Sequence, residues 1–138
     1  MIYKALLETR LRTRTQNGER DEIRHTVKAM VALREDGSWS LRYTDGENKG
    51  RTALAGTREW MTLSREGVVQ SKMRFVLDQL LPALYITPLG EFDMATRTDL
   101  YTFTVNDHSG RLSLHYDLLM SGELAAQNHL EVKWRKMP

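Results

Sequence analysis

The sequence contains no cysteine and only three prolines among its 138 residues. The lack of cysteine excludes a disulfide framework, a thiolate metal site and a cysteine nucleophile. No apolar run approaches the roughly 18 residues that a membrane-spanning helix needs. The N-terminus has no apolar stretch behind a basic start, as a signal peptide would have. Together these absences predict a cytoplasmic protein that does not enter a membrane.

A strong charge of one sign is also missing, because 20 Lys and Arg residues face 18 Asp and Glu residues and leave a net charge of +2. Nucleic-acid-binding proteins usually concentrate positive charge, so the composition alone does not indicate one. The hydrophobic fraction of 41% and charged fraction of 28% are typical of a globular protein. A chain of this length predicts a single domain over residues 1–138.

What the sequence does have is alternation of apolar and polar side chains with a period of two residues, which is typical of half-buried strands. The segments with this pattern are joined by turns rich in Gly, Asn and Asp, and strands and helices do not alternate along the chain. We therefore expect an all-β fold, an antiparallel closed barrel of eight to ten strands with at most one short helical turn. Closure removes the edges that long flat strands would expose.

The alternation also predicts the register of individual hairpins. If Leu33 and Trp39 both face inward, residues 35–37 must form a three-residue loop, because a two-residue loop would turn one strand over. Such a loop needs a left-handed third residue, and Gly37 occupies that position. The same reasoning predicts a turn of Ser121, Gly122 and Glu123 that pairs Leu114 with Leu130 and Tyr116 with Asn128. It also predicts a four-residue loop that pairs Phe103 with Leu114.

About two-thirds of the chain, and above all its C-terminal half, resembles the YwiB-like family of bacterial domains of unknown function. The resemblance rests on the turn Arg65-Glu66-Gly67, the segment from Tyr85 to Met94 (YITPLGEFDM), Gly110 and the Tyr-bearing strand around Tyr116. It implies a calycin-like barrel akin to lipocalins and fatty-acid-binding proteins, and it implies no activity. Residues 77–82 depart from the family pattern, and residues 73–84 have apolar residues at helical spacing. The resemblance favours strand–turn–strand there, with a helix as the alternative.

Polar side chains on inward positions of the barrel are the first candidate site, because a buried polar group needs a partner. The residues that we expect to contact a ligand are His25, Tyr43, Tyr85, Tyr116 and Asn128. An eight-stranded barrel can hold one small ligand. The leading hypothesis is therefore non-catalytic binding of a small, mostly apolar molecule. A satisfied core histidine is the alternative for His25.

Basic side chains on outward positions of the first strands are the second candidate site. They include Arg10, Arg12, Arg14, Arg24 and Lys28, and the first hairpin is expected to place Arg12 opposite Arg24. Opposed like charges cost stability, so an anion, an acidic protein or RNA is a candidate partner. A solvated surface is the alternative, and the lack of stacking aromatics weighs against single-stranded nucleic acid.

No catalytic site is indicated by the sequence. Residues 107–109 (Asp-His-Ser) are triad residue types, but consecutive turn residues cannot form a relay. His115 and His129 are expected to face each other on the outer surface, where a metal would still need a third ligand. We expect no metal and no cofactor, and we leave both the enzyme class and the oligomeric state open, a dimer included.

Overall fold

The computed structural model describes residues 1–44 and 50–138, and every regular element in these ranges is a strand. The long strands are β1 (Ile2–Thr15), β2 (Arg20–Leu33), β9 (Met94–Val105), β10 (Ser109–Met120) and β11 (Glu123–Lys136). The shorter ones are β3 (Trp39–Thr44), β4 (Arg51–Gly56), β5 (Trp60–Glu66), β6 (Gln70–Val76), β7 (Leu80–Thr87) and the two-residue β8 (Gly90–Glu91). None of these ranges contains a helix, so none contains a helix that could cross a membrane.

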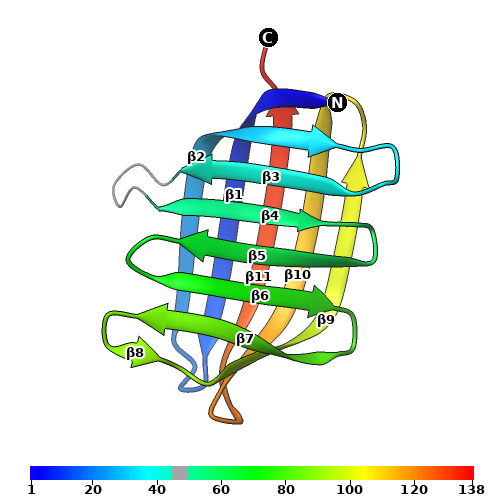
Figure 1. Ribbon diagram of the computed structural model, residues 1–138. Coiled ribbons are helices and arrows are strands. Elements are labelled where there is room, and N and C mark those ends of the chain that lie inside the picture. The colour runs from blue at the N-terminus through cyan, green and yellow to red at the C-terminus, as the bar shows by residue number, and fades with distance from the viewer. Residues whose placement is uncertain (45–49) are drawn as a thin grey trace.

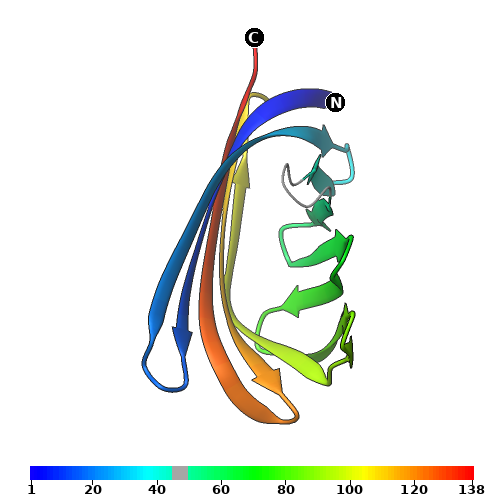
Figure 2. The same ribbon diagram turned by 90° about the vertical axis from the view of Figure 1, so that its left-hand side faces the viewer.

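The strands close into an antiparallel barrel of ten strands, which confirms the predicted fold class. The sheet runs β6-β5-β4-β3-β2-β1-β11-β10-β9-β7, and the pairing of β6 with β7 completes the ring, while β8 pairs only with β7. The short strands β3–β7 form one wall and cross in front of the long strands (Figure 1). The side view shows these two walls facing each other (Figure 2). Strands of facing walls that cross in this way are typical of orthogonal packing.

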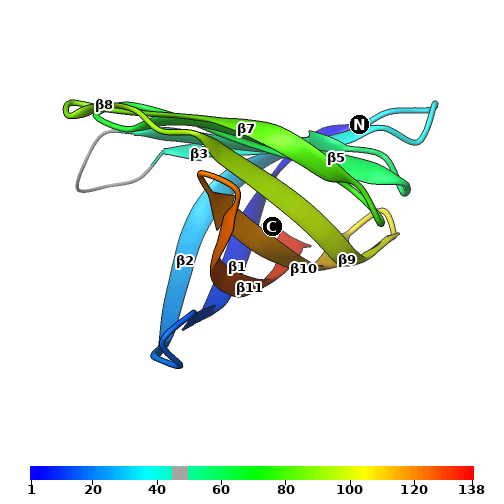
Figure 3. The ribbon, with the colours of Figure 1, turned by 90° about the horizontal axis from the view of Figure 1, so that it is seen from below.

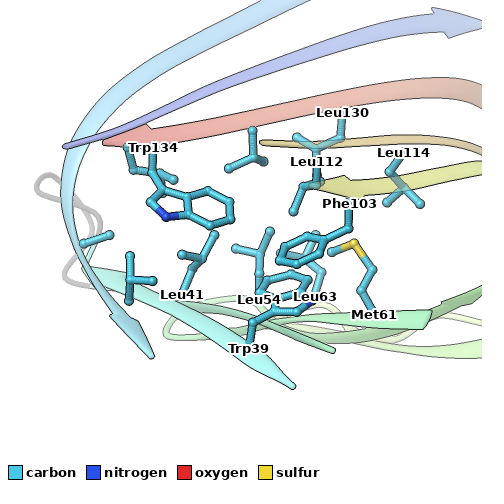
Figure 4. Close-up of a cluster of buried hydrophobic side chains, with 14 of the residues drawn as sticks. Trp39, Leu41, Leu54, Met61, Leu63, Phe103, Leu112, Leu114, Leu130 and Trp134 are labelled. Carbon is cyan, nitrogen blue, oxygen red and sulfur yellow. The ribbon is translucent and has the colours of Figure 1, made fainter. Parts of the chain in front are cut away.

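Apolar side chains from both walls fill the centre of the barrel (Figure 4). The ring of Trp39 stacks on that of Phe103, with centroids 4.7 Å apart and an angle of 9° between the planes. Trp134 packs against Phe103 and donates from its Nε1 to the Tyr3 hydroxyl at 3.1 Å. Trp39, Leu114 and Leu130 are buried in this cluster, and Leu33 packs against it, as the alternation predicts.

The loop of residues 35–37 has the predicted form. Leu33 pairs with Trp39, Gly37 has φ of 86°, and the Gly37 amide donates to the Arg34 carbonyl at 3.1 Å. Residues 73–84 also follow the favoured alternative, since they form the end of β6, a turn and the start of β7. Asp78 supplies the left-handed residue of that turn, with φ of 63°.

Two hairpin registers differ from the prediction by two residues. In the first hairpin Arg12 lies opposite Glu22 rather than Arg24, and Arg24 lies opposite Arg10. In the hairpin of β9 and β10, Phe103 pairs with Leu112 rather than Leu114. A shift of two keeps every side chain on its predicted face, because side chains alternate with period two.

The last hairpin keeps the predicted pairing of Leu114 with Leu130 but closes with a different turn. Ser121 and Gly122 form a two-residue loop with φ of 51° and 81°, as a type I′ turn requires. A bulge between Leu118 and Leu119 shifts the register by one residue. On the far side of this bulge from the turn, the strands therefore have the pairing that a three-residue turn would have given.

Candidate functional site

Polar side chains gather at one end of the barrel, next to the apolar core. Each of the five short strands β3–β7 carries one inward-facing residue that pairs with its counterpart on the next strand, so these residues lie side by side across the wall. In order across the wall, these residues are Tyr43, Thr52, Arg65, Ser71 and Tyr85. We call them the polar layer. Thr52 and Ser71 are buried, whereas Arg65 between them is exposed.

The long wall contributes buried polar residues that face inward as well. Thr98 and Asn128 lie on either side of Tyr116 in the pairings of β9, β10 and β11. Burial raises the pKa of the Tyr116 hydroxyl, and a side-chain hydrogen bond from Asn128 and the positive charge of Arg65 oppose that rise. Tyr116 also packs against Phe75 of β6, with ring centroids 4.7 Å apart, so this part of the long wall faces the short strand that carries Ser71.

Three of these buried side chains have an oxygen without a partner among the described residues. They are Thr52 Oγ1, Thr98 Oγ1 and Asn128 Oδ1, in side chains of residues that are 2%, 1% and 9% exposed. A buried polar atom left unpaired costs about 1–3 kcal/mol. Such atoms therefore mark a position where a water molecule or a ligand group completes the hydrogen bonding.

Arg65 is the residue that sequence reasoning missed at this end of the barrel. It was assigned to a turn, but β5 continues to Glu66 and the turn begins at Gly67. Arg65 shares the inward face with Met61 and Leu63, so the alternation along β5 contains the signal. Within residues 1–44 and 50–138, no ion pair or hydrogen bond holds its guanidinium group.

The five residues predicted to contact a ligand all face inward, but they do not all lie together. Tyr43, Tyr85, Tyr116 and Asn128 belong to the polar end of the barrel, and Tyr85 meets Phe92 edge to face at 6.1 Å. His25 faces inward on β2 but is exposed. The hairpin of β1 and β2 extends away from the short strands (Figure 3), and β2 pairs with β3 only from Met30 to Leu33. The expectation that His25 lies within the enclosed interior is therefore wrong.

On the outer surface, one carboxylate holds three of the predicted arginines. Glu22 accepts from Arg10 Nε at 2.7 Å, from Arg12 Nε at 3.2 Å and from Arg24 Nε at 3.1 Å. Hydrogen bonding from Arg10 is the largest of the effects that lower the pKa of Glu22. The opposition of Arg10 and Arg24 is thus compensated within the chain, by a residue that the sequence analysis did not single out.

Arg14 is not compensated in this way. It lies directly opposite Arg20 near the tip of the first hairpin, and neither residue has an ion pair among the described residues. Both line a shallow depression of about 620 Å³ on the barrel exterior, which Arg12 and His129 also line. Lys28 lies apart from them, opposite Leu6 and nearer the other end of β1.

His115 and His129 face each other as predicted, with ring centroids 3.8 Å apart. His129 Nε2 lies 3.2 Å from Ser113 Oγ and 3.3 Å from a Glu131 carboxylate oxygen. Among the described residues, no group of three or more His, Cys, Asp and Glu side chains is arranged to hold a metal ion. Burial lowers the pKa of His129, and the neighbouring His115 lowers it further.

This lowered pKa predicts a loss of stability in mild acid. The native protein disfavours the protonated form of His129, so the unfolded chain binds more protons as the pH falls below the ordinary histidine value of about 6.5. The free energy of unfolding should fall between pH 7.5 and 5.5, and it should fall less in His129→Gln. Urea unfolding at both pH values measures this difference, with His108→Gln in an exposed loop as the control. An equal loss in wild type and His129→Gln would contradict the assignment.

Comparisons with known proteins bear on the fold and on the family of the chain. The family model described as a domain of unknown function, DUF1934, matches residues 9–132. The crystal structure of the YwiB protein from Bacillus subtilis superimposes with a TM-score of 0.86 at 17% sequence identity, over 99% of this chain and 94% of that one. A search of curated proteins finds no match. At this identity the YwiB structure supports the fold alone, whereas the family model covers most of the sequence. The chain therefore belongs to the DUF1934 family.

Proposed function

We propose that this protein binds a small anionic molecule at the polar end of its barrel, without catalysing a reaction on it. The observation that carries the proposal is Arg65. Its guanidinium group faces inward among Thr52 and Ser71, is exposed to solvent, and has no anionic partner among the described residues. A guanidinium group suits carboxylate and phosphate groups, because its planar fork can donate two parallel hydrogen bonds.

The unpaired buried oxygens support the same position for a ligand. Hydroxyl or amine groups on the ligand, or a bridging water molecule, would supply donors to Thr98 Oγ1 and Asn128 Oδ1. The rings of Tyr43, Tyr85 and Tyr116 would contact an apolar part of the ligand. Small-molecule sites commonly combine apolar walls with a few placed polar groups in this way.

The deep interior is not the proposed position, although a mostly apolar ligand was the first hypothesis. The stacked rings of Trp39 and Phe103, together with Trp134, occupy the centre of the barrel (Figure 4). The end that contains Arg65 combines solvent access with inward-facing polar groups. The expected ligand is therefore small and acidic, with a modest apolar part.

Arg65→Gln should weaken binding at this site while the fold is kept, because the substitution removes the charge from a side chain that is exposed at the barrel end. We expect native mass spectrometry of the purified wild-type protein to show a bound small molecule that Arg65→Gln loses. Loss of a hydrogen bond to a charged group costs about 1.5–3 kcal/mol, so affinity should fall by at least tenfold.

Arg42→Gln is the matched control, because Arg42 lies on the outward face of the same short wall. It should retain the bound molecule in the same proportion as the wild type. A ligand that stays bound in Arg65→Gln, or one that both variants lose equally, would contradict the proposal.

A further inference from the structure

The outward face of the long strands concentrates positive charge that the whole-chain composition conceals. Alternation along the paired strands places basic residues on this one face of the barrel. From β1 and β2 they are Lys4, Arg10, Arg12, Arg14, Arg20, Arg24 and Lys28. From β9, β10 and β11 they are Arg97, Arg111, Lys133 and Arg135. The net charge of the whole chain is only +2, but most acidic residues of the described ranges lie in loops and on the short strands, so the long strands carry more positive than negative charge. We call this surface the basic face.

Acidic residues neutralise only part of the basic face. Glu22 engages three arginines, Glu8 binds Lys133 at 3.1 Å, and Asp117 binds Arg97 at 2.7 Å. In the described part of the chain, the cations on this face that have no ion pair are Lys4, Arg14, Arg20, Lys28, Arg111 and Arg135. Arg14 and Arg20 are also directly opposed, which costs stability unless an anion lies between or above them.

The surface between these cations is hollowed. The depression of about 620 Å³ is lined by Arg12, Arg14 and Arg20, and also by the acidic residues Asp21, Glu22, Asp99 and Asp117. A second one of about 470 Å³ is lined by Arg10, Arg24, Arg111 and Lys133, and also by Glu8 and Glu131. Arg10, Arg12 and Arg14 follow one another along β1, where alternate residues stand about 6.5–7 Å apart. The cations of β1 therefore form a row beside these two hollows.

We propose that the basic face binds the phosphate backbone of a nucleic-acid duplex. A row of separate guanidinium groups suits a ligand that presents phosphates at repeated positions. None of the outward positions of β1, β2, β9, β10 and β11 carries Phe, Tyr or Trp. Single-strand binders need such rings to stack bases, so a duplex fits this surface better and would be bound without sequence preference.

Fluorescence anisotropy with a labelled 20-base-pair RNA duplex, and with the DNA duplex of the same sequence, tests the proposal. Affinity should fall at least tenfold between 50 and 200 mM KCl, because counterions are released on binding. Arg14→Glu combined with Arg20→Glu should weaken binding at least tenfold at 50 mM KCl. It should also reduce the slope of log affinity against log salt by about 2, since two phosphate contacts are lost. The two duplexes distinguish an RNA ligand from a DNA ligand.

Arg42→Glu combined with Arg51→Glu is the matched control, because both residues face outward on the short wall. It should change affinity by less than twofold. Circular dichroism checks that each variant is folded, and Arg14→Gln with Arg20→Gln should show a smaller loss than the charge reversal. The proposal is overturned if the wild type does not bind at 50 mM KCl or if the two reversed pairs weaken binding equally. If poly-glutamate binds as tightly as the duplex, the partner is an acidic protein and the proposal is overturned. The proposal is also overturned if a single strand binds ten times more tightly than the duplex.

Discussion

Trp39→Ala should lower the free energy of unfolding by about 3–5 kcal/mol, the range typical of truncating a buried large aromatic residue. Trp39 is 1% exposed and stacks on Phe103 between the two walls. Its indole Nε1 also donates to the carbonyl oxygen of Thr57 at 3.2 Å. The substitution would leave a cavity at the centre of the barrel and remove the partner of that carbonyl, although the Tyr101 hydroxyl still donates to it.

Urea unfolding followed by circular dichroism measures this loss, and Trp60→Ala is its matched control. Trp60 lies on the outward face of β5, where the Arg74 guanidinium group sits 5.0 Å from its ring. Its truncation opens no cavity in the core, so it should cost less than half as much as Trp39→Ala. Equal losses would mean that the central stack does not hold the two walls together.

Gly110→Ala should destabilise the protein by about 1–3 kcal/mol, the usual cost of overpacking a core. Gly110 lies directly opposite Trp134 on β11, and a Cβ at this position would collide with the six-membered ring of the indole. The indole cannot easily move aside, because it donates to the Tyr3 hydroxyl and packs against Phe103. The glycine is therefore needed for the space that it leaves beside the tryptophan.

A double-mutant cycle with Trp134→Leu isolates this clash from other effects of the substitution. In the Trp134→Leu background the collision is absent, so Gly110→Ala should cost less than half of its value in the wild type. Chemical denaturation of the four proteins gives the interaction energy. An unchanged cost would show that the backbone at Gly110, and not the indole, rejects a side chain.

The strand registers of the first two hairpins follow from one type of loop, a three-residue loop that ends in a left-handed glycine. Gly37 and Gly18 close equivalent three-residue loops, with φ of 86° and 83° and the same pair of backbone hydrogen bonds. The rule was applied at Gly37 and gave the observed register. Applied at Gly18, it would have paired Thr15 with Glu19 and placed Arg12 opposite Glu22, as the structure does.

The other register error had a side-chain cause that alternation cannot detect. Asn106 Oδ1 accepts from the amides of His108 and Ser109, each at 2.9 Å, and so draws the loop between β9 and β10 tight. The strands therefore begin pairing closer to the loop than predicted, and Phe103 meets Leu112. Because the displacement is even, the assignment of inward and outward faces was correct despite the wrong partners.

The sequence predicted which side chains face inward, but not which of them belong to the candidate site. Alternation identified Tyr43, Tyr116 and Asn128 as inward-facing, and the hairpin register placed the last two side by side. It could not show that His25 lies where no short strand covers β2. Arg65 was missed for a different reason, since it was assigned to a turn although it continues the inward face of β5.

The most direct test of the proposed function is an NMR titration with phenyl phosphate that follows the Arg65 Nε–H signal and the Asn128 amide signals. Phenyl phosphate combines an anion with one aromatic ring, as the polar end of the barrel would require. The account predicts saturable shifts at Arg65 and Asn128, with little change at Arg14 and Arg20 on the exterior. Shifts confined to the exterior arginines, or no saturable shift at Arg65, would contradict it.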